Sequence, residues 1–268
     1  MHRNHILFSP TKGGELVMYE FTDFKKIDMH SHIGTWGNPF NFSGDINLVI
    51  DLMDKFNIEK TVLCPSDSSK NADILEAYEK AKDKIIPVPW VDCTKEQAAY
   101  DELEYLIRDK GCKGAKIQSL FDGYAADSPI VDPVAEICES YNVPFFVHSG
   151  HEPFSLPWQI GLLAERHPKC KFVMLHMGHG HGIYVEAAQT IAKRYKNIWL
   201  ETSGTSMTAQ IFNAYKNVGN DRVMFGLDTP FHAPEVEIQK ILSCPLKEKD
   251  YENIFYNNAK NFLGSLLD

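Results

Sequence analysis

Eight short apolar runs, each followed by a longer segment of helical periodicity, constrain the fold of this chain more than any other feature. The runs are KIDMHSH (26–32), KTVLCPS (60–66), IIPVPWVD (85–92), CKGAKIQ (112–118), VPFFVHS (143–149), KFVMLHM (171–177), NIWLETS (197–203) and RVMFGLD (222–228). Amphipathic segments follow at 45–57, 72–83, 95–110, 131–142, 157–167 and 183–197, with weaker ones at 207–218 and 234–242 and a closing helix at 250–264. Eight strand–helix units in about 250 residues are typical of a (β/α)₈ TIM barrel of the α/β class. A doubly wound open sheet is the alternative, but it rarely uses eight units, and no glycine-rich fingerprint follows the first run.

The chain shows no Gly/Ser linker and no block of like charges. We therefore expect one catalytic barrel domain over residues 26–268, preceded by an N-terminal extension over residues 1–25. Within the extension, SPTKGGELVMYE predicts a hairpin with a Gly13-Gly14 turn, which could cap the barrel floor.

Charge and composition narrow the function classes. The formal net charge of −9 argues against a nucleic-acid partner or an anionic membrane, because both need a basic surface. The N-terminus lacks an apolar stretch long enough for a signal peptide, and no run of 18 apolar residues occurs. The six cysteines are scattered without a C-x-x-C pair, so we expect reduced thiols in a cytoplasmic protein and no cysteine-ligated metal.

Polar side chains stand where the predicted strands end, which is where catalytic groups gather in a parallel barrel. From the first run to the last they are His30, His32, Lys116, His148, His176, Glu201 and Asp228. A lone histidine in such a place is more often structural, and Asp228 before Thr-Pro could be a turn former. However, four histidines and an aspartate at one rim would be poorly solvated without a cation, and these residue types suit zinc. We therefore expect a metal site, into which His30 and His32, two residues apart on one strand face, can both point.

Several other residues have structural roles or line the predicted pocket. Cys64 and Asp92 are predicted to be packing and helix-entry residues, and Glu201 could either contact substrate or support a ligand by hydrogen bonding. We expect His2, His5 and His167 at the surface, whereas the post-strand loops that could line a pocket carry His151, His179, His181 and His232. Core packing does not explain all the aromatic residues of these loops, which makes Trp36 a candidate substrate contact; they are Trp36, Phe40, Phe121, Tyr124, Phe154 and Trp158.

Taken in order, these motifs resemble the amidohydrolase superfamily, specifically its amidohydrolase-related (amidohydrolase 2) branch. That branch contains aminocarboxymuconate-semialdehyde decarboxylase, γ-resorcylate decarboxylase and pyrone-dicarboxylate lactonase. The resemblance runs from about residue 26 to 264 through IDMHSH, FFVHSG, LHMGH, WLETSG, VMFGLDTPF and NIFYNNAKNFLG. It implies a distorted TIM barrel with a catalytic divalent metal, usually zinc.

The resemblance also assigns roles. His30, His32, His148 and Asp228 match the metal-ligand positions. His176 matches a histidine that binds a second metal in binuclear members and acts as an acid or base in mononuclear ones. Lys116 matches a lysine that is carboxylated in binuclear members, whereas in this branch a basic residue there more often contacts a substrate anion. We expect one ion of zinc or another divalent transition metal, with two ions as the alternative.

This site favours hydrolysis of an amide, lactone or similar ester-like bond of a small molecule. A zinc ion would lower the pKa of bound water, Asp228 would accept and return its proton, and His176 would polarise the carbonyl or donate a proton. The alternative is a metal-dependent, non-oxidative decarboxylase of a small aromatic or unsaturated acid, in which His176 protonates the carbon that loses CO₂.

Arginine placement favours the hydrolase, because a loop arginine would help a decarboxylase bind its acid. The chain's arginines instead fall in predicted helices or at a strand start, at Arg108, Arg166, Arg194 and Arg222. A non-enzymatic metal-binding scaffold is a third interpretation, and the open coordination position and aromatic rim argue against it. The expected partner is a small-molecule substrate, and a homo-oligomer is compatible with the sequence.

Overall fold

The computed structural model describes residues 11–12, 15–16 and 19–268 and contains eight parallel strands that coincide with the eight predicted runs. They are β3 (Lys26–His32), β6 (Ile58–Cys64), β7 (Ile85–Pro87), β8 (Ala115–Ile117), β9 (Phe145–His148), β10 (Phe172–Leu175), β11 (Ile198–Glu201) and β12 (Val223–Met224). Their neighbours follow chain order in two groups, β3-β6-β7 and β8-β9-β10-β11-β12.

Backbone pairing joins the two groups into a closed barrel. On one side, Trp90 pairs in parallel with Lys116, whose backbone N–H donates to Pro89 O at 2.8 Å. On the other side, Ser31 pairs in parallel with Thr229. Closure leaves the eight described strands of the barrel without a free edge, and it brings the first and last of them side by side. The predicted TIM barrel is confirmed.

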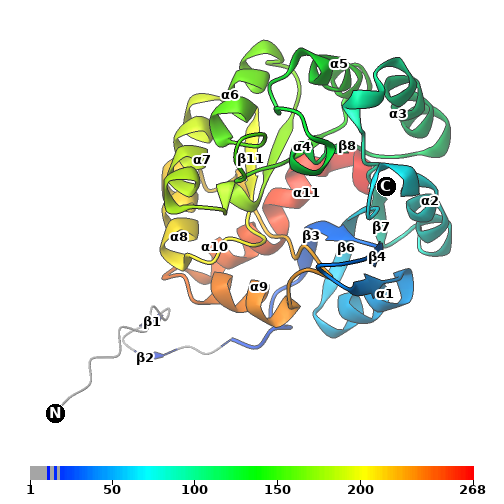
Figure 1. Cartoon of the computed structure of the whole chain (residues 1–268). Helices are drawn as coiled ribbons and strands as arrows, with labels where there is room; N and C mark the ends of the chain where they lie inside the picture. The colour runs from blue at the N-terminus through cyan, green and yellow to red at the C-terminus, as the bar shows by residue number, and fades with distance from the viewer. Residues whose placement is uncertain (1–10, 13–14, 17–18) are drawn as a thin grey trace.

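Helices surround the strands (Figure 1). They are α1 (Ile46–Lys55), α2 (Asn71–Lys80), α3 (Gln97–Lys110), α5 (Asp132–Tyr141), α6 (Pro157–Arg166), α7 (Gly182–Arg194), α8 (Thr208–Val218) and α9 (Pro234–Leu242). Each buries an apolar stripe, for example Ile46, Val49 and Met53 of α1, and Asp45 caps that helix by accepting from Leu48 N at 2.9 Å. The amphipathic segments of the sequence therefore form the outer layer of the barrel.

The closing segment differs from the single helix expected over 250–264. It consists of α10 (Glu248–Glu252), a π-helical turn (Asn253–Asn257) and α11 (Asn258–Leu263). The wide turn has a physical reason, because Ile254 O accepts a hydrogen bond from Phe225 N at 3.0 Å after β12. Asn258 also donates to Val223 O at 2.8 Å, which fastens α11 to the same strand.

α11 lies behind the barrel in Figure 1, at the end opposite the C-terminal ends of the strands. Its Phe262 packs on Trp199 of β11 with 4.7 Å between ring centroids. Inside the barrel, α11 residues join side chains from the strands, such as Met29 and Phe146, in one buried cluster. The interior below the mouth is therefore a packed core.

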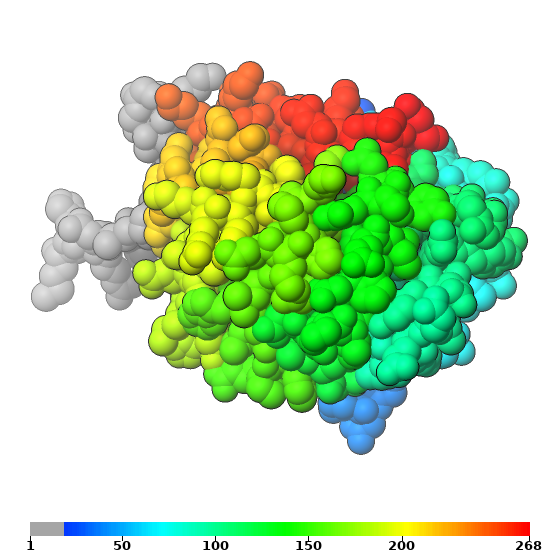
Figure 2. Space-filling model, turned by 90° about the horizontal axis from the view of Figure 1, so that it is seen from above, coloured from blue at the N-terminus to red at the C-terminus, as the bar shows by residue number. Residues whose placement is uncertain are grey.

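Two local elements were not predicted. Between β3 and α1, the chain makes an antiparallel pair, β4 (Gly34–Trp36) and β5 (Phe42–Gly44), and a short α4 (Ser119–Asp122) follows β8. The blue segment that contains β4 and β5 projects from the body of the molecule in Figure 2. Both elements carry aromatic side chains beside the barrel mouth, which gives them a role in shaping the site.

At the N-terminal end, β1 (Thr11–Lys12) pairs antiparallel with β2 (Glu15–Leu16). The predicted Gly13-Gly14 turn between them lies outside the described residues. Within the described part of the chain, no helix combines the length and apolar character needed to cross a bilayer.

Phe262 allows a test of the packing between α11 and the barrel. Replacing this buried side chain (8% exposed) by alanine removes its contact with Trp199, so we expect Phe262→Ala to lower the free energy of unfolding by about 3 kcal/mol. Phe262→Leu keeps most of the volume and should cost markedly less. Urea unfolding followed by circular dichroism measures both, and equal stability of Phe262→Ala and wild type would contradict this packing role.

Candidate functional site

A cavity of about 320 Å³ opens at the C-terminal ends of the strands. Its lining consists of His30, His32, Trp36, Phe40, Trp90, Lys116, Gln118, Leu120, Phe121, His148, His151, His176, His179, Asp228, Phe231 and His232. Of the seven residues predicted for the site from the strand ends, all but Glu201 therefore meet in one place.

The innermost group contains two imidazoles, an ammonium and a carboxylate. His30 Nε2 and His32 Nε2 are 3.0 Å apart, and Lys116 Nζ lies 3.1 Å from the first and 2.9 Å from the second. Asp228 Oδ1 lies 3.6 Å from His30 Nδ1 and 3.5 Å from His32 Nε2. The alternation of side chains along β3 thus places both histidines in the mouth, as expected.

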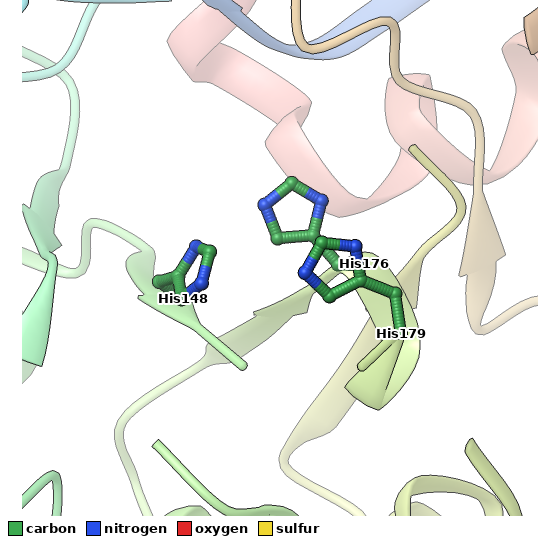
Figure 3. A group of neighbouring side chains, drawn as sticks. All are labelled: His148, His176 and His179. Atoms are coloured by element: carbon green, nitrogen blue, oxygen red, sulfur yellow. The ribbon is translucent and has the colours of Figure 1, made fainter. Parts of the chain in front are cut away.

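A second group of imidazoles consists of His148, His176 and His179 (Figure 3), and it adjoins the first through His176, whose ring centroid lies 5.0 Å from that of His30. His148 of β9 lies 4.8 Å, between ring centroids, from His176, which follows β10. His176 stacks on His179 with 4.4 Å between centroids, and His148 Nε2 lies 2.8 Å from His151 Nδ1. His148 therefore shares one group of possible metal ligands with His176 and His179.

Hydrogen bonds from the loops fix how the imidazoles are oriented. His32 Nδ1 lies 2.9 Å from Pro65 O, and His176 Nδ1 lies 3.0 Å from both the carbonyl oxygen and the hydroxyl of Ser203. Because Ser203 Oγ donates its own proton to Glu201 at 2.7 Å, it accepts from His176. The Nδ1 atom of His176 therefore carries hydrogen, and its Nε2 is free for a ligand or a proton.

Glu201 anchors this network from outside the cavity. Its side chain is fully buried and accepts hydrogen bonds from the Ser203 hydroxyl and, at 3.2 Å, from the His176 backbone N–H. Position 226 must be glycine because a Cβ there would overlap the Glu201 carboxylate. Of the two roles considered for Glu201, support by hydrogen bonding fits this position, and direct contact with substrate does not.

Backbone conformation at two functional positions is unusual. Asp228 has φ +54° and His176 has φ +66°, both in the left-handed region that non-glycine residues rarely adopt. Hydrogen bonds hold the first of these, because Asp228 N donates to His30 O at 2.6 Å. Such strain collects at sites where side-chain direction matters more than local stability.

Burial dominates the electrostatics of the site. It holds the pKa of His30, His32, His148 and His176 well below the usual value, and the nearby Lys116 ammonium adds to the effect at His30 and His32. Burial also lowers the pKa of Lys116 and raises that of Asp228. Neutral imidazoles with free electron pairs are the form in which histidine binds a metal.

The donor set fits a divalent cation. His30, His32 and Asp228 each offer one ligand atom, and these atoms lie within 4.8 Å of one another, as do those of His148, His176 and His179. His179 Nε2 is buried and has no hydrogen-bond partner. Imidazole and carboxylate donors suit zinc and other divalent transition metals, so the chain has a candidate His/Asp metal site.

Aromatic side chains form the walls above this polar floor. On one side, Trp36 of β4 packs on Phe231 with 5.1 Å between ring centroids. On another, Trp90 stacks on Phe121 at 6.2 Å and 16°, and its indole N–H donates to Asp122 at 2.8 Å. Lys116 Nζ lies 5.2 Å from the centroid of the Trp90 ring. The walls therefore suit a flat, apolar molecular surface.

Some of the remaining predicted residues line the cavity, and others lie outside it. Trp36, Phe40 and Phe121 line the cavity, but Tyr124, Phe154 and Trp158 do not, and neither does His181, which caps α7. His167 was wrongly expected at the surface: it is buried, and its Nε2 lies 2.9 Å from Asp132 Oδ1. Cys64 lies in the core and Asp92 caps a 3₁₀ turn, as predicted, whereas His2 and His5 lie outside the described residues.

Sequence reasoning missed four lining residues, Trp90, Gln118, Leu120 and Phe231. Gln118 comes two residues after Lys116, and Trp90 falls inside the third predicted strand run. Side-chain alternation could have flagged Gln118. Phe231 follows the Asp228-Thr-Pro motif and Leu120 lies in the unpredicted α4, so neither carried a periodic signal.

Comparisons with known proteins identify relatives of this chain. The family model described as Amidohydrolase matches residues 57–265. The γ-resorcylate decarboxylase of a Polaromonas species is 22% identical over 214 residues, or 62% of this chain. The chain covers 66% of that relative's length, just under two thirds.

Two solved structures are similar in fold. One is the dihydroxybenzoic acid decarboxylase of a Polaromonas species, with bound manganese and the inhibitor 2-nitroresorcinol (TM-score 0.72, 18% identity, 90% of this chain and 97% of the other). The second is the 5-carboxyvanillate decarboxylase of Novosphingobium aromaticivorans, complexed with manganese and 4-hydroxy-3-methoxy-5-nitrobenzoic acid (TM-score 0.69, 15% identity, 96% and 99%).

These findings correct the expectation of a hydrolase, because the relative and both similar structures are decarboxylases. The metal ligands could not separate the two reactions, since one ligand set serves both. The positions of the arginines were a misleading guide to the reaction. Lys116 lies in the cavity, so an acid can be bound there without a loop arginine.

Glu201 gives a test of the buried network through the pH dependence of stability. Burial raises the pKa of its carboxyl to about 7, so the folded state holds this proton more tightly than the unfolded chain does. The contribution of the group to stability is therefore present at low pH and is lost as the pH rises from about 4.3, the unfolded pKa, through about 7.

We expect metal-free Glu201→Gln, which cannot ionise, to gain stability relative to wild type over this pH range and to show no further gain above it. Urea unfolding at several pH values measures this difference. Glu235→Gln is the matched control, because Lys55 lowers the pKa of this exposed carboxyl and the relative gain should be absent. A pH-independent difference between Glu201→Gln and wild type would contradict the buried carboxyl.

Proposed function

The chain belongs to the amidohydrolase family and is an enzyme of that superfamily, and from this premise we propose that it catalyses the metal-dependent, non-oxidative decarboxylation of a small aromatic acid. One observation carries the proposal: a buried ammonium and a metal-binding group of imidazoles lie beneath aromatic walls in one cavity. The names of the relatives support the same reaction.

We assign His30, His32, His148 and Asp228 as the ligands of one divalent ion, either Mn²⁺ or Zn²⁺. The grouping of His30, His32 and Asp228 supports this assignment, and the manganese in the similar structures supports the metal class. A divalent ion held there would supply positive charge that stabilises the electron-rich ring formed as CO₂ leaves. The group of His148, His176 and His179 is the candidate for a second ion.

The chain's own residues would bind the acid and move one proton. Lys116, as an ammonium, attracts the substrate carboxylate, and the walls formed by Trp36 and Trp90 orient the ring. The bond between ring carbon and carboxylate breaks, its electron pair stays on the ring carbon, and CO₂ departs. His176 Nε2 takes up a proton from solvent and delivers that proton to the ring carbon, while Nδ1 keeps its own hydrogen in the bonds to Ser203.

Other expectations from the sequence stay proposals. The expected partner is a small molecule, and we propose neither a nucleic-acid nor a membrane partner. A cytoplasmic location and a homo-oligomer are compatible with the chain. The non-enzymatic scaffold has lost its support, because the family is one of enzymes.

Metal content tests the ligand assignment. Protein purified after growth with added metal, or metal-free protein reloaded with Mn²⁺ or Zn²⁺, should hold about one equivalent by elemental analysis. The double variant His30→Ala, His32→Ala should lose it, whereas His181→Ala, outside the cavity, should not. Two equivalents, one of them lost in His179→Ala, would indicate a second ion. Less than about a tenth of an equivalent in wild type would rule out the site.

Reaction products test the chemistry. Metal-loaded protein incubated with hydroxybenzoic acids should release CO₂ and, in D₂O, place one deuteron on the carbon that carried the carboxylate. His176→Asn should lower kcat by at least ~10²-fold, the scale of a lost proton donor, and leave metal content and KM nearly unchanged. The proposal fails if no acid of this class releases CO₂ above the rate with metal-free protein.

A further inference from the structure

The charged groups of the cavity are concentrated at its floor. Lys116 and Asp228 are 1% and 7% exposed, respectively. Among the described residues of the lining, Lys116 is the single lysine or arginine. The other polar side chains of the lining, apart from Asp228, are imidazoles and the Gln118 amide, which can form hydrogen bonds but carry no fixed charge.

The mouth of the cavity is aromatic. Phe40 and Phe121 are 45% and 53% exposed and line its opening, from the β4–β5 segment and α4 respectively. Phe231, which belongs to the cavity wall, contacts Phe40 with 5.5 Å between the two ring centroids. Leu120 adds a further apolar side chain. An acidic group bound near this mouth would lose part of its hydration without gaining a cation.

The two similar structures hold small molecules that differ in their number of acidic groups. 2-Nitroresorcinol has a nitro group and two hydroxyls, whereas 4-hydroxy-3-methoxy-5-nitrobenzoic acid carries a carboxylate in addition to its nitro group. If the reacting group of an acid occupies the floor beside Lys116, a second acid group on a flat ring points toward the aromatic mouth. Charge placement in the cavity therefore decides between acids with one and with two carboxylates.

Resting on the proposed function, we propose that the substrate is a monocarboxylic aromatic acid and that the cavity rejects aromatic dicarboxylates. The single ammonium beside His30 and His32 pairs with one carboxylate, and the mouth formed by Phe40, Phe121 and Phe231 offers a second one no partner. Phe121 is the position at which this selectivity can be changed, because it stacks on Trp90 at the opening.

Three matched probes test the selectivity, and the His176→Asn protein is used so that turnover is slow. They are 2-hydroxybenzoate, 5-carbamoyl-2-hydroxybenzoate (the amide probe) and 5-carboxy-2-hydroxybenzoate (the carboxylate probe), which share one carboxylate for the floor and differ only at the end that would face the mouth. We expect Mn²⁺-loaded protein, in calorimetric titrations, to bind the carboxylate probe at least ~10-fold more weakly than the equally large amide, as for a charged group left unpaired. Equal or tighter binding of the carboxylate probe overturns the proposal.

A second experiment introduces a positive charge at the mouth. Phe121→Arg places a guanidinium that can stack on Trp90, and it should tighten the carboxylate probe at least ~10-fold and leave the amide probe nearly unchanged. Phe121→Leu is the matched control and should not change the ratio between the two probes. If both variants change the ratio equally, shape rather than charge sets the selectivity, and the proposal is wrong.

The proposed decarboxylase activity and the proposed charge selectivity can be overturned separately. Discrimination between the probes with no CO₂ released from any hydroxybenzoic acid supports the charge selectivity and overturns the decarboxylase. CO₂ release with equal affinity for the carboxylate and amide probes overturns the selectivity alone. Failure of all three probes to bind, together with no CO₂ release, overturns both.

Discussion

The closure of the barrel is the constraint on which the site depends. Met29 N donates to Phe225 O at 3.0 Å, Asp228 N to His30 O at 2.6 Å and His32 N to Thr229 O at 2.7 Å. These bonds join the first strand to the chain that follows the last one, and they run through the candidate ligands themselves. A shift of one residue in this register would turn the side chains of β3 to the opposite face and separate His30 and His32 from Asp228.

Closure also buries ionisable groups that need partners. Asp28, below the ligands on β3, accepts from Thr61 Oγ1 at 2.5 Å, from Ser31 Oγ at 2.6 Å and from Leu227 N at 2.8 Å. It thereby connects β3, β6 and the end of β12. Glu201 likewise connects β11 to β10, because Ser203 forms hydrogen bonds with both Glu201 and His176. Buried carboxylates with several donors are costly to leave unpaired, so they make the positions of the ligands rigid.

Chemistry at such a site depends on more than its metal ligands. Histidines at fixed strand ends serve hydrolysis and decarboxylation alike, since both reactions need a charge-stabilising centre and a proton carrier. What differs is how the acid is held and which groups surround its ring. In this chain, the Lys116 ammonium lies against two imidazoles at the floor, and aromatic rings rather than cations form the mouth. These features, and not the ligand set, favour decarboxylation of an acid with one carboxylate.

The sequence by itself determined the barrel and the main residues of the cavity. Alternation of apolar runs and amphipathic segments is a local property, and strand ends must meet at the mouth of any parallel barrel, so His30, His32, Lys116, His148, His176 and Asp228 could be found without coordinates. Only the tertiary structure decided which of these residues are neighbours, that Glu201 stands behind Ser203 outside the cavity, and that Trp90 and Phe231 line it. Those outcomes depend on strand tilt, register and loop paths, which bring together residues far apart in the chain and leave no periodic trace in the sequence.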